Sequence, residues 1–221
     1  MPTSTAENYL KTIWLIESRS GGIATVGVLA EALQLTPGTV TTMIKGLATK
    51  GLLEHLPREG VRLTNEGRAV ALNVLRKHRL LETFLVQVLK MDWTEVHREA
   101  EALEHAVSDR VLERIDAMLG RPAADPHGDP IPNPKGRLDE REDRISLATC
   151  VLQKPLRVVR IYDQSPEFLD FVQKIGLKPG TKLRVSRRDK ASGVVHCHLR
   201  SDEDTVLGFP EAGKIEVRAV G

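Results

Sequence analysis

The hydrophobic period of this chain changes once, and that change limits its fold more than any other feature. Through about residue 120, apolar residues recur every three to four positions, as they do in amphipathic helices. After about residue 143 they alternate with polar residues, as they do in strands with one buried face. The stretch between is rich in Pro, Gly, Asp and Arg and is typical of a linker. The sequence therefore predicts a multidomain, mainly α protein with a small C-terminal β-barrel.

The first part of the chain predicts a winged helix-turn-helix. Two short amphipathic helices come first, separated by a pair of glycines. Thr36 followed by Pro37 is a favourable start for a third helix, which runs to about Lys50. Residues 52–63 then indicate two short strands around a polar turn. Three helices followed by a hairpin, with links this short, form a winged helix.

The third helix has the residues that a DNA-recognition helix needs. Small polar side chains at its N-terminal end can approach base edges and bond to phosphates, while Lys and Arg in the helix and hairpin can contact phosphates. The DNA-contacting residues that we expect are Thr36, Gly38, Thr39, Thr41, Thr42, Lys45, Lys50, Arg58 and Arg62. On the pattern alone, a helical hairpin of some other protein explains these residues equally well.

Histidine and glutamate recur at helical spacing in the next part of the chain. Four of them fall at offsets that predict one stripe of a helix: His97, Glu101, Glu104 and His105. The preceding long helix supplies His78 and Glu82, which are also one turn apart. Such nitrogen and oxygen donors suit a first-row divalent metal such as manganese, ferrous iron or cobalt. A solvated, salt-bridged helix face is the alternative explanation of the same spacing.

Composition argues against several other classes of protein. The two cysteines, Cys150 and Cys197, are too few for a disulfide framework, and neither lies in the region of residues 78–105, which argues against a structural zinc site there. There is no signal-peptide pattern and no apolar run of membrane-spanning length, so we expect a cytoplasmic protein without a membrane partner. No His-Glu-x-x-His or nucleophile motif indicates an enzyme.

The helices that follow the hairpin have apolar faces broader than one winged helix can cover. We therefore expect part of that surface to be buried against a second copy of the chain, giving a homodimer. The net charge of +2 is nearly neutral, so a DNA-binding surface has to come from local clustering of Lys and Arg.

Several blocks of the sequence resemble the diphtheria-toxin-repressor family of metal-dependent regulators, which has iron-sensing and manganese-sensing branches. The resemblance is densest over residues 7–13, 75–82 and 96–109, and residues 127–132 resemble a proline segment of that family. It covers nearly the whole chain and points to the three-domain form, with likeness to the manganese transport regulators. It implies a winged helix-turn-helix domain, a helical dimerisation and metal-binding domain, a linker and an SH3-like domain: residues 1–72, 73–138, 139–149 and 150–221.

The same resemblance implies two metal sites. The ancillary site falls on His78, Glu82 and His97, with Gln164 and Glu167 of the barrel as candidates to complete it. The primary site falls on Asn8, Glu101, Glu104 and His105. The iron branch has Met and Cys where this chain has Asn8 and Glu101, so the oxygen donors favour Mn²⁺ over Fe²⁺.

Lys11 departs from the manganese branch, whose paired-metal site has a carboxylate at that place. A cation there cannot ligate and would repel a second ion. We therefore predict two separated metal sites rather than a close pair.

In the family, metal locks the first helix against the dimerisation domain and so sets the spacing of the recognition helices. We expect a repressor of metal-uptake genes that binds a near-palindromic operator in double-stranded DNA when manganese is bound. A ferrous-iron-responsive repressor of the same fold and a metal-independent winged-helix regulator are the alternatives, and a metal hydrolase is disfavoured.

Overall fold

A computed structural model describes residues 2–56, 58–138, 144–199 and 204–220. The chain divides into two compact units, and each is described by itself. Unit one comprises Met1–His78, Ala102–Leu112 and Pro132–Leu138. Unit two comprises Arg79–Glu101, Glu113–Ile131 and Asp139–Gly221. Among the described residues, no helix is long and apolar enough to cross a bilayer.

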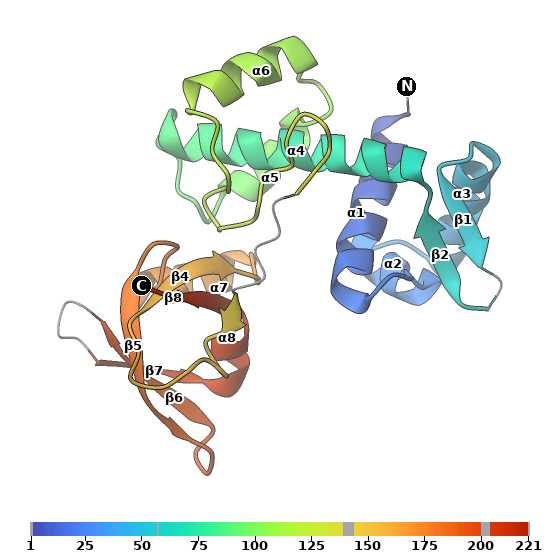
Figure 1. Cartoon of the computed structure of the whole chain (residues 1–221). Helices are drawn as coiled ribbons and strands as arrows, with labels where there is room; N and C mark the ends of the chain where they lie inside the picture. The colour runs from blue at the N-terminus through green and yellow to red at the C-terminus, as the bar shows by residue number, and fades with distance from the viewer. Residues whose placement is uncertain (1, 57, 139–143, 200–203, 221) are drawn as a thin grey trace. The chain divides into compact units, whose positions relative to one another are not determined.

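Unit one contains the predicted winged helix (Figure 1). Its elements are α1 (Ser4–Ser20), α2 (Val26–Leu33), α3 (Pro37–Thr49), β1 (Leu53–Leu56), β2 (Gly60–Leu63) and the first part of α4 (Asn65–Gln87). β1 and β2 pair in antiparallel register, with Leu53 opposite Leu63. One core joins the helices to the hairpin, and its buried residues include Leu10, Ile13, Val40, Ile44 and Val61. The predicted order of helix, helix, helix and hairpin is confirmed.

Local capping explains where these helices begin. The Thr36 hydroxyl accepts a hydrogen bond from the Thr39 N–H at 3.3 Å, and Pro37 occupies the first turn of α3, where its missing N–H is not needed. The Thr64 hydroxyl accepts from the Gly67 N–H at 3.1 Å at the start of α4. The chain that leaves the hairpin therefore enters the long helix directly.

Two shorter helices follow α4: α5 (Val96–Leu103) and α6 (Asp109–Met118). The sequence predicted that the first of them would reach residue 107, and this is wrong. Backbone N–H groups of Ala106 and Val107 both donate to the Leu103 carbonyl, which closes a turn. Glu104 and His105 therefore lie beyond the end of α5.

The segment after α6 was predicted as the start of a loose linker, and the structure corrects this. Asp125 accepts backbone hydrogen bonds from His127 at 2.8 Å and Asp129 at 3.0 Å, which ties the segment into a compact loop. All three side chains are buried. The remainder of the predicted linker, residues 139–143, lies outside the described residues.

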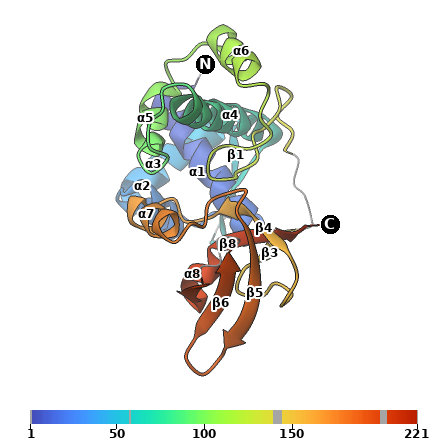
Figure 2. The same ribbon diagram turned by 90° about the vertical axis from the view of Figure 1, so that its left-hand side faces the viewer.

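Unit two contains a six-stranded antiparallel sheet with the strand order β3-β8-β4-β5-β6-β7. Figure 2 labels β3, β4, β5, β6 and β8 of this sheet. The strands are β3 (Ile145–Ser146), β4 (Leu156–Ile161), β5 (Lys182–Asp189), β6 (Val194–Leu199), β7 (Asp204–Gly208) and β8 (Ile215–Ala219). Two helices accompany them: α7 (Pro166–Lys174) and α8 (Phe209–Gly213). The sequence predicted strands at residues 156–161, 182–185, 194–198 and 215–220 and a helix near 166–175. It missed β3, β7 and α8, and β3 lies within the predicted linker 139–149. The predicted class of fold, two helical parts and a small β domain, is confirmed.

The buried loop of unit two is fastened to β4. The His127 carbonyl accepts a hydrogen bond from the Ile161 N–H at 2.8 Å. A Cβ on Gly128 would lie 2.0 Å from the Val159 carbonyl oxygen, so only glycine allows this approach. The His127 ring stacks on Trp93 with 5.4 Å between ring centroids. His127 is thus held in place by the barrel as well as by its own loop.

Candidate metal centres and recognition helix

Two groups of carboxylate and histidine side chains gather in the described part of the chain. The first, which we call the Glu104 cluster, lies in unit one and consists of Glu7, Asn8, Lys11, His78, Glu104 and His105. The second, which we call the Glu82 cluster, lies in unit two and consists of Glu82, His97, Asp125 and His127.

Glu104 is the centre of the first cluster and is fully buried. Its Oε1 accepts a hydrogen bond from Lys11 Nζ at 2.5 Å, and its Oε2 lies 2.7 Å from His78 Nδ1. Burial alone would raise the pKa of Glu104, but His78 and Lys11 stabilise the carboxylate and the pKa is lowered. Glu104 is therefore a buried carboxylate, and each of its two oxygens has a partner at hydrogen-bond distance.

His105 joins this carboxylate to the first helix. Its Nε2 lies 3.4 Å from Glu104 Oε1 and 2.8 Å from Asn8 Oδ1. Its Nδ1 lies 2.6 Å from Glu7 Oε2. Three of the residues predicted for the primary site, Asn8, Glu104 and His105, are thus brought into contact, and their binding of metal stays a prediction.

Glu101, the fourth residue predicted for that site, lies elsewhere on α5. Its side chain is half exposed, and its Oε1 lies 3.8 Å from His97 Nε2, one turn earlier. The prediction of one helical stripe from His97 to His105 is wrong because α5 ends at Leu103. Glu104 then enters the turn and is buried, whereas Glu101 stays on the helix surface.

Glu82 is buried, and its two oxygens face different histidines. Oε1 lies 3.2 Å from His97 Nδ1, and Oε2 lies 3.7 Å from His127 Nδ1. Of the three helical residues predicted for the ancillary site, Glu82 and His97 meet within unit two. His78 precedes Glu82 by one turn of α4 and ends the first segment of unit one. Ligation by these three residues stays a prediction.

Asp125 and His127 form a further group with Glu82 that the sequence interpretation missed. All three residues are buried, and donor atoms of Glu82, Asp125 and His127 lie within 4.8 Å of one another. Among the described residues, Asp125 Oδ2 and His127 Nδ1 have no hydrogen-bond partner. Buried polar atoms are rarely left in this state, so both point to a place for a ligand. The available signal was the Asp-x-His-x-Asp spacing of residues 125–129, within a segment taken for a linker.

When no metal ion is bound, bound protons and the buried Arg79 guanidinium, whose Nε lies 3.8 Å from Asp125 Oδ2, compensate the charge of this group. Burial and the neighbouring Asp129 and Glu82 carboxylates raise the pKa of Asp125 to about 8. Burial favours the neutral form of His127, but the Glu82 and Asp125 carboxylates outweigh it and raise its pKa to about 9. A cation bound here would displace these protons.

Residues around Asp129 connect the loop to the barrel. Asp129 pairs with Arg160 of β4, and its Oδ1 lies 3.8 Å from Arg79 of α4. The Gln164 side-chain amide donates to Asp129 Oδ2 at 2.6 Å, and Glu167 is exposed on α7. The described contact of Gln164 is therefore with an aspartate, and ligation by Gln164 or Glu167 stays a prediction.

The predicted recognition helix presents its threonines on the surface of unit one. The Thr36 and Thr39 hydroxyls lie 2.9 Å apart, and those of Thr41 and Thr42 donate to backbone carbonyls one turn earlier. Thr41 is half-buried. The other predicted DNA-contacting residues of the helix and hairpin are exposed: Gly38, Lys45, Lys50, Arg58 and Arg62. The arrangement offers hydroxyls and cations together, and DNA contact by these residues stays a prediction.

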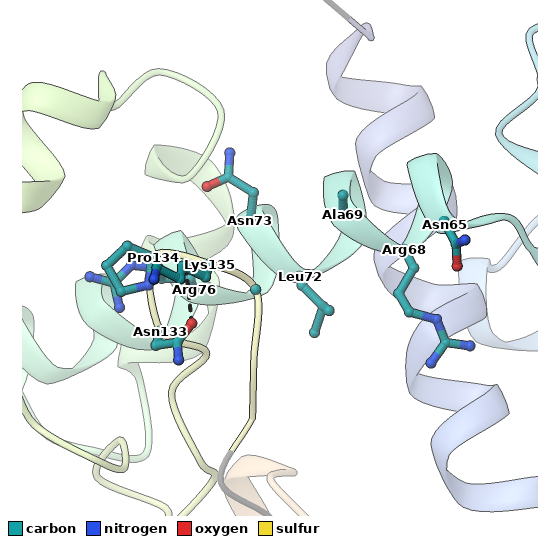
Figure 3. A pocket seen from close by; sticks show the side chains of 10 residues that line it. Asn65, Arg68, Ala69, Leu72, Asn73, Arg76, Asn133, Pro134 and Lys135 are labelled. Carbon is teal, nitrogen blue, oxygen red and sulfur yellow. Dashed lines mark hydrogen bonds between the residues drawn. The ribbon is translucent and has the colours of Figure 1, made fainter.

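A separate pocket of about 420 Å³ lies in unit one, between the first half of α4 and the loop at residues 133–136. Figure 3 shows Arg68 and Leu72 along the helix, and Asn133 and Lys135 of the loop near Arg76. The described residues that line it include no carboxylate, histidine or cysteine, so its lining does not suit a metal ion.

Comparison with known proteins places the chain in a family. Its residues 1–61 match the model of the iron-dependent repressor N-terminal DNA-binding domain. Residues 64–133 match the iron-dependent repressor metal-binding and dimerisation domain, and residues 145–219 match the FeoA domain. The diphtheria toxin repressor of Corynebacterium glutamicum is 36% identical over 221 residues, covering 96% of each chain. The chain belongs to the iron-dependent repressor family.

Other members of the family carry names for both metals. The iron-dependent repressor IdeR of Mycobacterium leprae is 39% identical over 129 residues, 58% of this chain and 55% of that protein. The chain thus aligns with only about half the length of that relative. A solved structure titled as a manganese-dependent transcriptional repressor complex with manganese has 40% identity and a TM-score of 0.88, and covers 97% of this chain and 100% of its own. The names therefore support a metal-dependent repressor and do not choose the metal.

Proposed function

We propose that this chain is a metal-activated, DNA-binding transcriptional repressor and not an enzyme. It acts as a cytoplasmic homodimer on a near-palindromic operator in double-stranded DNA. The observation that carries this proposal is the contact of α1 with Glu104 and His105, in the turn that follows α5. Asn8 and Lys11 belong to the helix on which the winged-helix core is built, and they contact His105 and Glu104.

The residues present fit a first-row divalent ion. Both clusters offer carboxylate or amide oxygen and imidazole nitrogen, and the buried Asp125 and His127 have donor atoms without partners among the described residues. Both cysteines belong to the barrel core, so no thiolate from the described residues enters either cluster. A bound ion would supply positive charge and fixed coordination geometry. Because the residues that define the two clusters include no thiolate or thioether, manganese is the ion that we favour, with ferrous iron as the alternative.

The Glu104 cluster is the proposed regulatory site. Asn8, Glu104 and His105 would hold the ion, with Glu101 as a further predicted ligand. These contacts join α1 to the turn that follows α5. The core that surrounds α1 also contains Val40 of α3, so the position of α1 affects the recognition helix. By linkage, an ion that favours one position of α1 favours DNA binding, and DNA in turn tightens ion binding.

The Glu82 cluster is the proposed second site. Glu82, Asp125 and His127 would hold the ion there, with His97 close to the other oxygen of Glu82. His127 is fixed to β4 through its backbone and to Trp93 through its ring. An ion at this cluster would therefore stabilise the attachment of the buried loop to the barrel.

Exposed apolar residues on α5 and α6 support the proposed dimer. Leu103, Val111 and Met118 are 39%, 50% and 63% exposed. Such side chains are usually buried, and exposed apolar surface marks an interaction site when it gathers on neighbouring helices.

The proposal is tested by fluorescence anisotropy of labelled DNA fragments that the protein selects from its source genome. Binding is measured with chelator, and then with added Mn²⁺ or Fe²⁺. We expect binding only with metal, and loss of that binding in a Glu104→Ala, His105→Ala variant that still folds. An Asp170→Ala variant, altered on the exposed surface of α7, is the matched control and should bind as the wild type does.

Equal DNA binding in chelator and in metal would contradict the metal switch and favour the metal-independent winged-helix regulator. The ion that gives half-maximal binding at the lower free concentration decides between manganese and ferrous iron.

A further inference from the structure

Lys11 is a buried cation within the proposed regulatory site. Its side chain is 7% exposed, and its partner Glu104 is fully buried. Desolvating an ammonium group is costly unless a close counter-charge compensates for it. The Lys11–Glu104 pair at 2.5 Å provides that compensation without any bound ion.

The oxygen that Lys11 occupies is the one that faces the other donors. Glu104 Oε1 lies 3.4 Å from His105 Nε2, which in turn lies 2.8 Å from Asn8 Oδ1. A divalent ion held by these three atoms would have to share Oε1 with the Lys11 ammonium. Two cations on one carboxylate oxygen in a buried setting repel each other strongly.

We propose that Lys11 is a tethered counter-ion that the metal has to displace from Glu104, so that Lys11 sets the metal concentration at which the protein responds. The inference rests on the proposed function and adds a competitor to its regulatory site. Without metal, Lys11 neutralises Glu104 and holds α1 against the turn that follows α5. With metal, the ammonium withdraws, and part of the binding free energy of the ion is spent on that exchange.

Removal of the Lys11 charge should have effects of opposite sign on the two states. In the metal-free protein, Glu104 loses the cation that contacts its Oε1, and the protein becomes less stable. The metal site loses its internal competitor and binds the ion more tightly. A lysine with only a packing role would lower stability without raising metal affinity, so the pair of measurements separates the two roles.

The experiment titrates full-length protein with Mn²⁺ alone against a competing fluorescent chelator, and records thermal unfolding in chelator. For Lys11→Met we expect affinity at the Glu104 site to rise by about tenfold or more, and the unfolding midpoint of the metal-free protein to fall. Lys11→Arg keeps the charge and should stay within about threefold of the wild type. Lys77→Met is the matched control, because Lys77 also lies in unit one but contacts Val107 and Asp109.

Equal or weaker manganese binding by Lys11→Met would overturn this inference while leaving the proposed function intact. A wild-type chain that binds no manganese or ferrous iron would instead contradict the proposed function. If the Met variant does not fold, Lys11→Gln replaces it, because its amide still donates to Glu104 and lacks the charge; the same rise in affinity is expected.

Discussion

The Glu104 and Glu82 clusters are built from the same residue types but are satisfied in different ways. Both oxygens of Glu104 have close partners, and one of these partners is the Lys11 ammonium. In the Glu82 cluster, Asp125 and His127 each keep a buried polar atom without a hydrogen-bond partner among the described residues. In the Glu104 cluster the Lys11 ammonium contacts the carboxylate directly, whereas beside the Glu82 cluster the Arg79 guanidinium stays 3.8 Å from Asp125 Oδ2 and protons supply further compensation.

The difference indicates how each cluster would respond to a metal ion. At the Glu104 cluster a metal ion has to displace the Lys11 ammonium. This competition weakens metal binding and raises the metal concentration at which the site fills. At the Glu82 cluster an ion displaces protons and relieves repulsion among carboxylates, so binding is opposed by acid instead. We infer that the first cluster suits a regulatory role and the second a structural one.

The largest effect is expected for Glu104→Gln in the metal-free protein. The change removes the carboxylate charge that lies 2.5 Å from the buried Lys11 ammonium, and removal of one partner of a buried ion pair typically destabilises by about 3–5 kcal/mol. We expect a clear fall in the midpoint of thermal or urea unfolding in chelator. Glu101→Gln is the matched control, because that side chain is half exposed and should change stability by less than about 0.5 kcal/mol. Equal unfolding midpoints for the two variants would show that the Lys11–Glu104 ion pair does not stabilise the metal-free protein.

A smaller effect is expected from pH at the Glu82 cluster. The pKa of His127 is raised from 6.5 to about 9, so the folded protein holds this proton more tightly than the unfolded chain does. The resulting stability is complete below pH 6.5 and is lost as pH rises through about 9. The raised pKa of Asp125 acts in the same direction. For the metal-free protein we expect a loss on the order of 1–3 kcal/mol between neutral and alkaline pH, measured by urea unfolding.

Asp125→Asn provides the control for this pH dependence. The asparagine oxygen can still accept the backbone hydrogen bonds from His127 and Asp129, while Glu82 is left as the one carboxylate of this cluster that raises the pKa of His127. We expect a flatter dependence on pH and a reduced stabilisation by added Mn²⁺. A variant with the same pH dependence as the wild type would show that this cluster does not hold the protons assigned to it.

The smallest effect is the coupling between the two clusters. Lys11 and Asp125 belong to different units, so a change at one should leave the other nearly unaffected. For Lys11→Met combined with Asp125→Asn, we expect the unfolding free energies of the single variants to add within about 0.5 kcal/mol. A larger deviation in a double-mutant cycle would mean that α4, which carries both His78 and Glu82, transmits changes between the clusters.

Much of the fold could be predicted because its signals are local. Thr36-Pro37 starts α3 through contacts within four residues, and Thr64 starts α4 in the same way. The short strand β3 and the end of α5 escaped prediction because neither has a local signal of this kind. β3 is defined by its pairing with β8. α5 ends where the N–H groups of Ala106 and Val107, in the turn before α6, donate hydrogen bonds to the carbonyl of its last residue, Leu103.

The sequence alone predicted the order of the helices and hairpin and the chemical types of the donors. It could not determine which donors meet. Lys11 and Glu104 are 93 residues apart, and only the packing of α1 beside the turn after α5 brings them together. Asp125 and His127 reach Glu82 only because their loop is fixed on β4. Hydrophobic periodicity shows which side chains share a face of one helix or strand. The contacts within the two clusters depend instead on how several helices, strands and loops pack together.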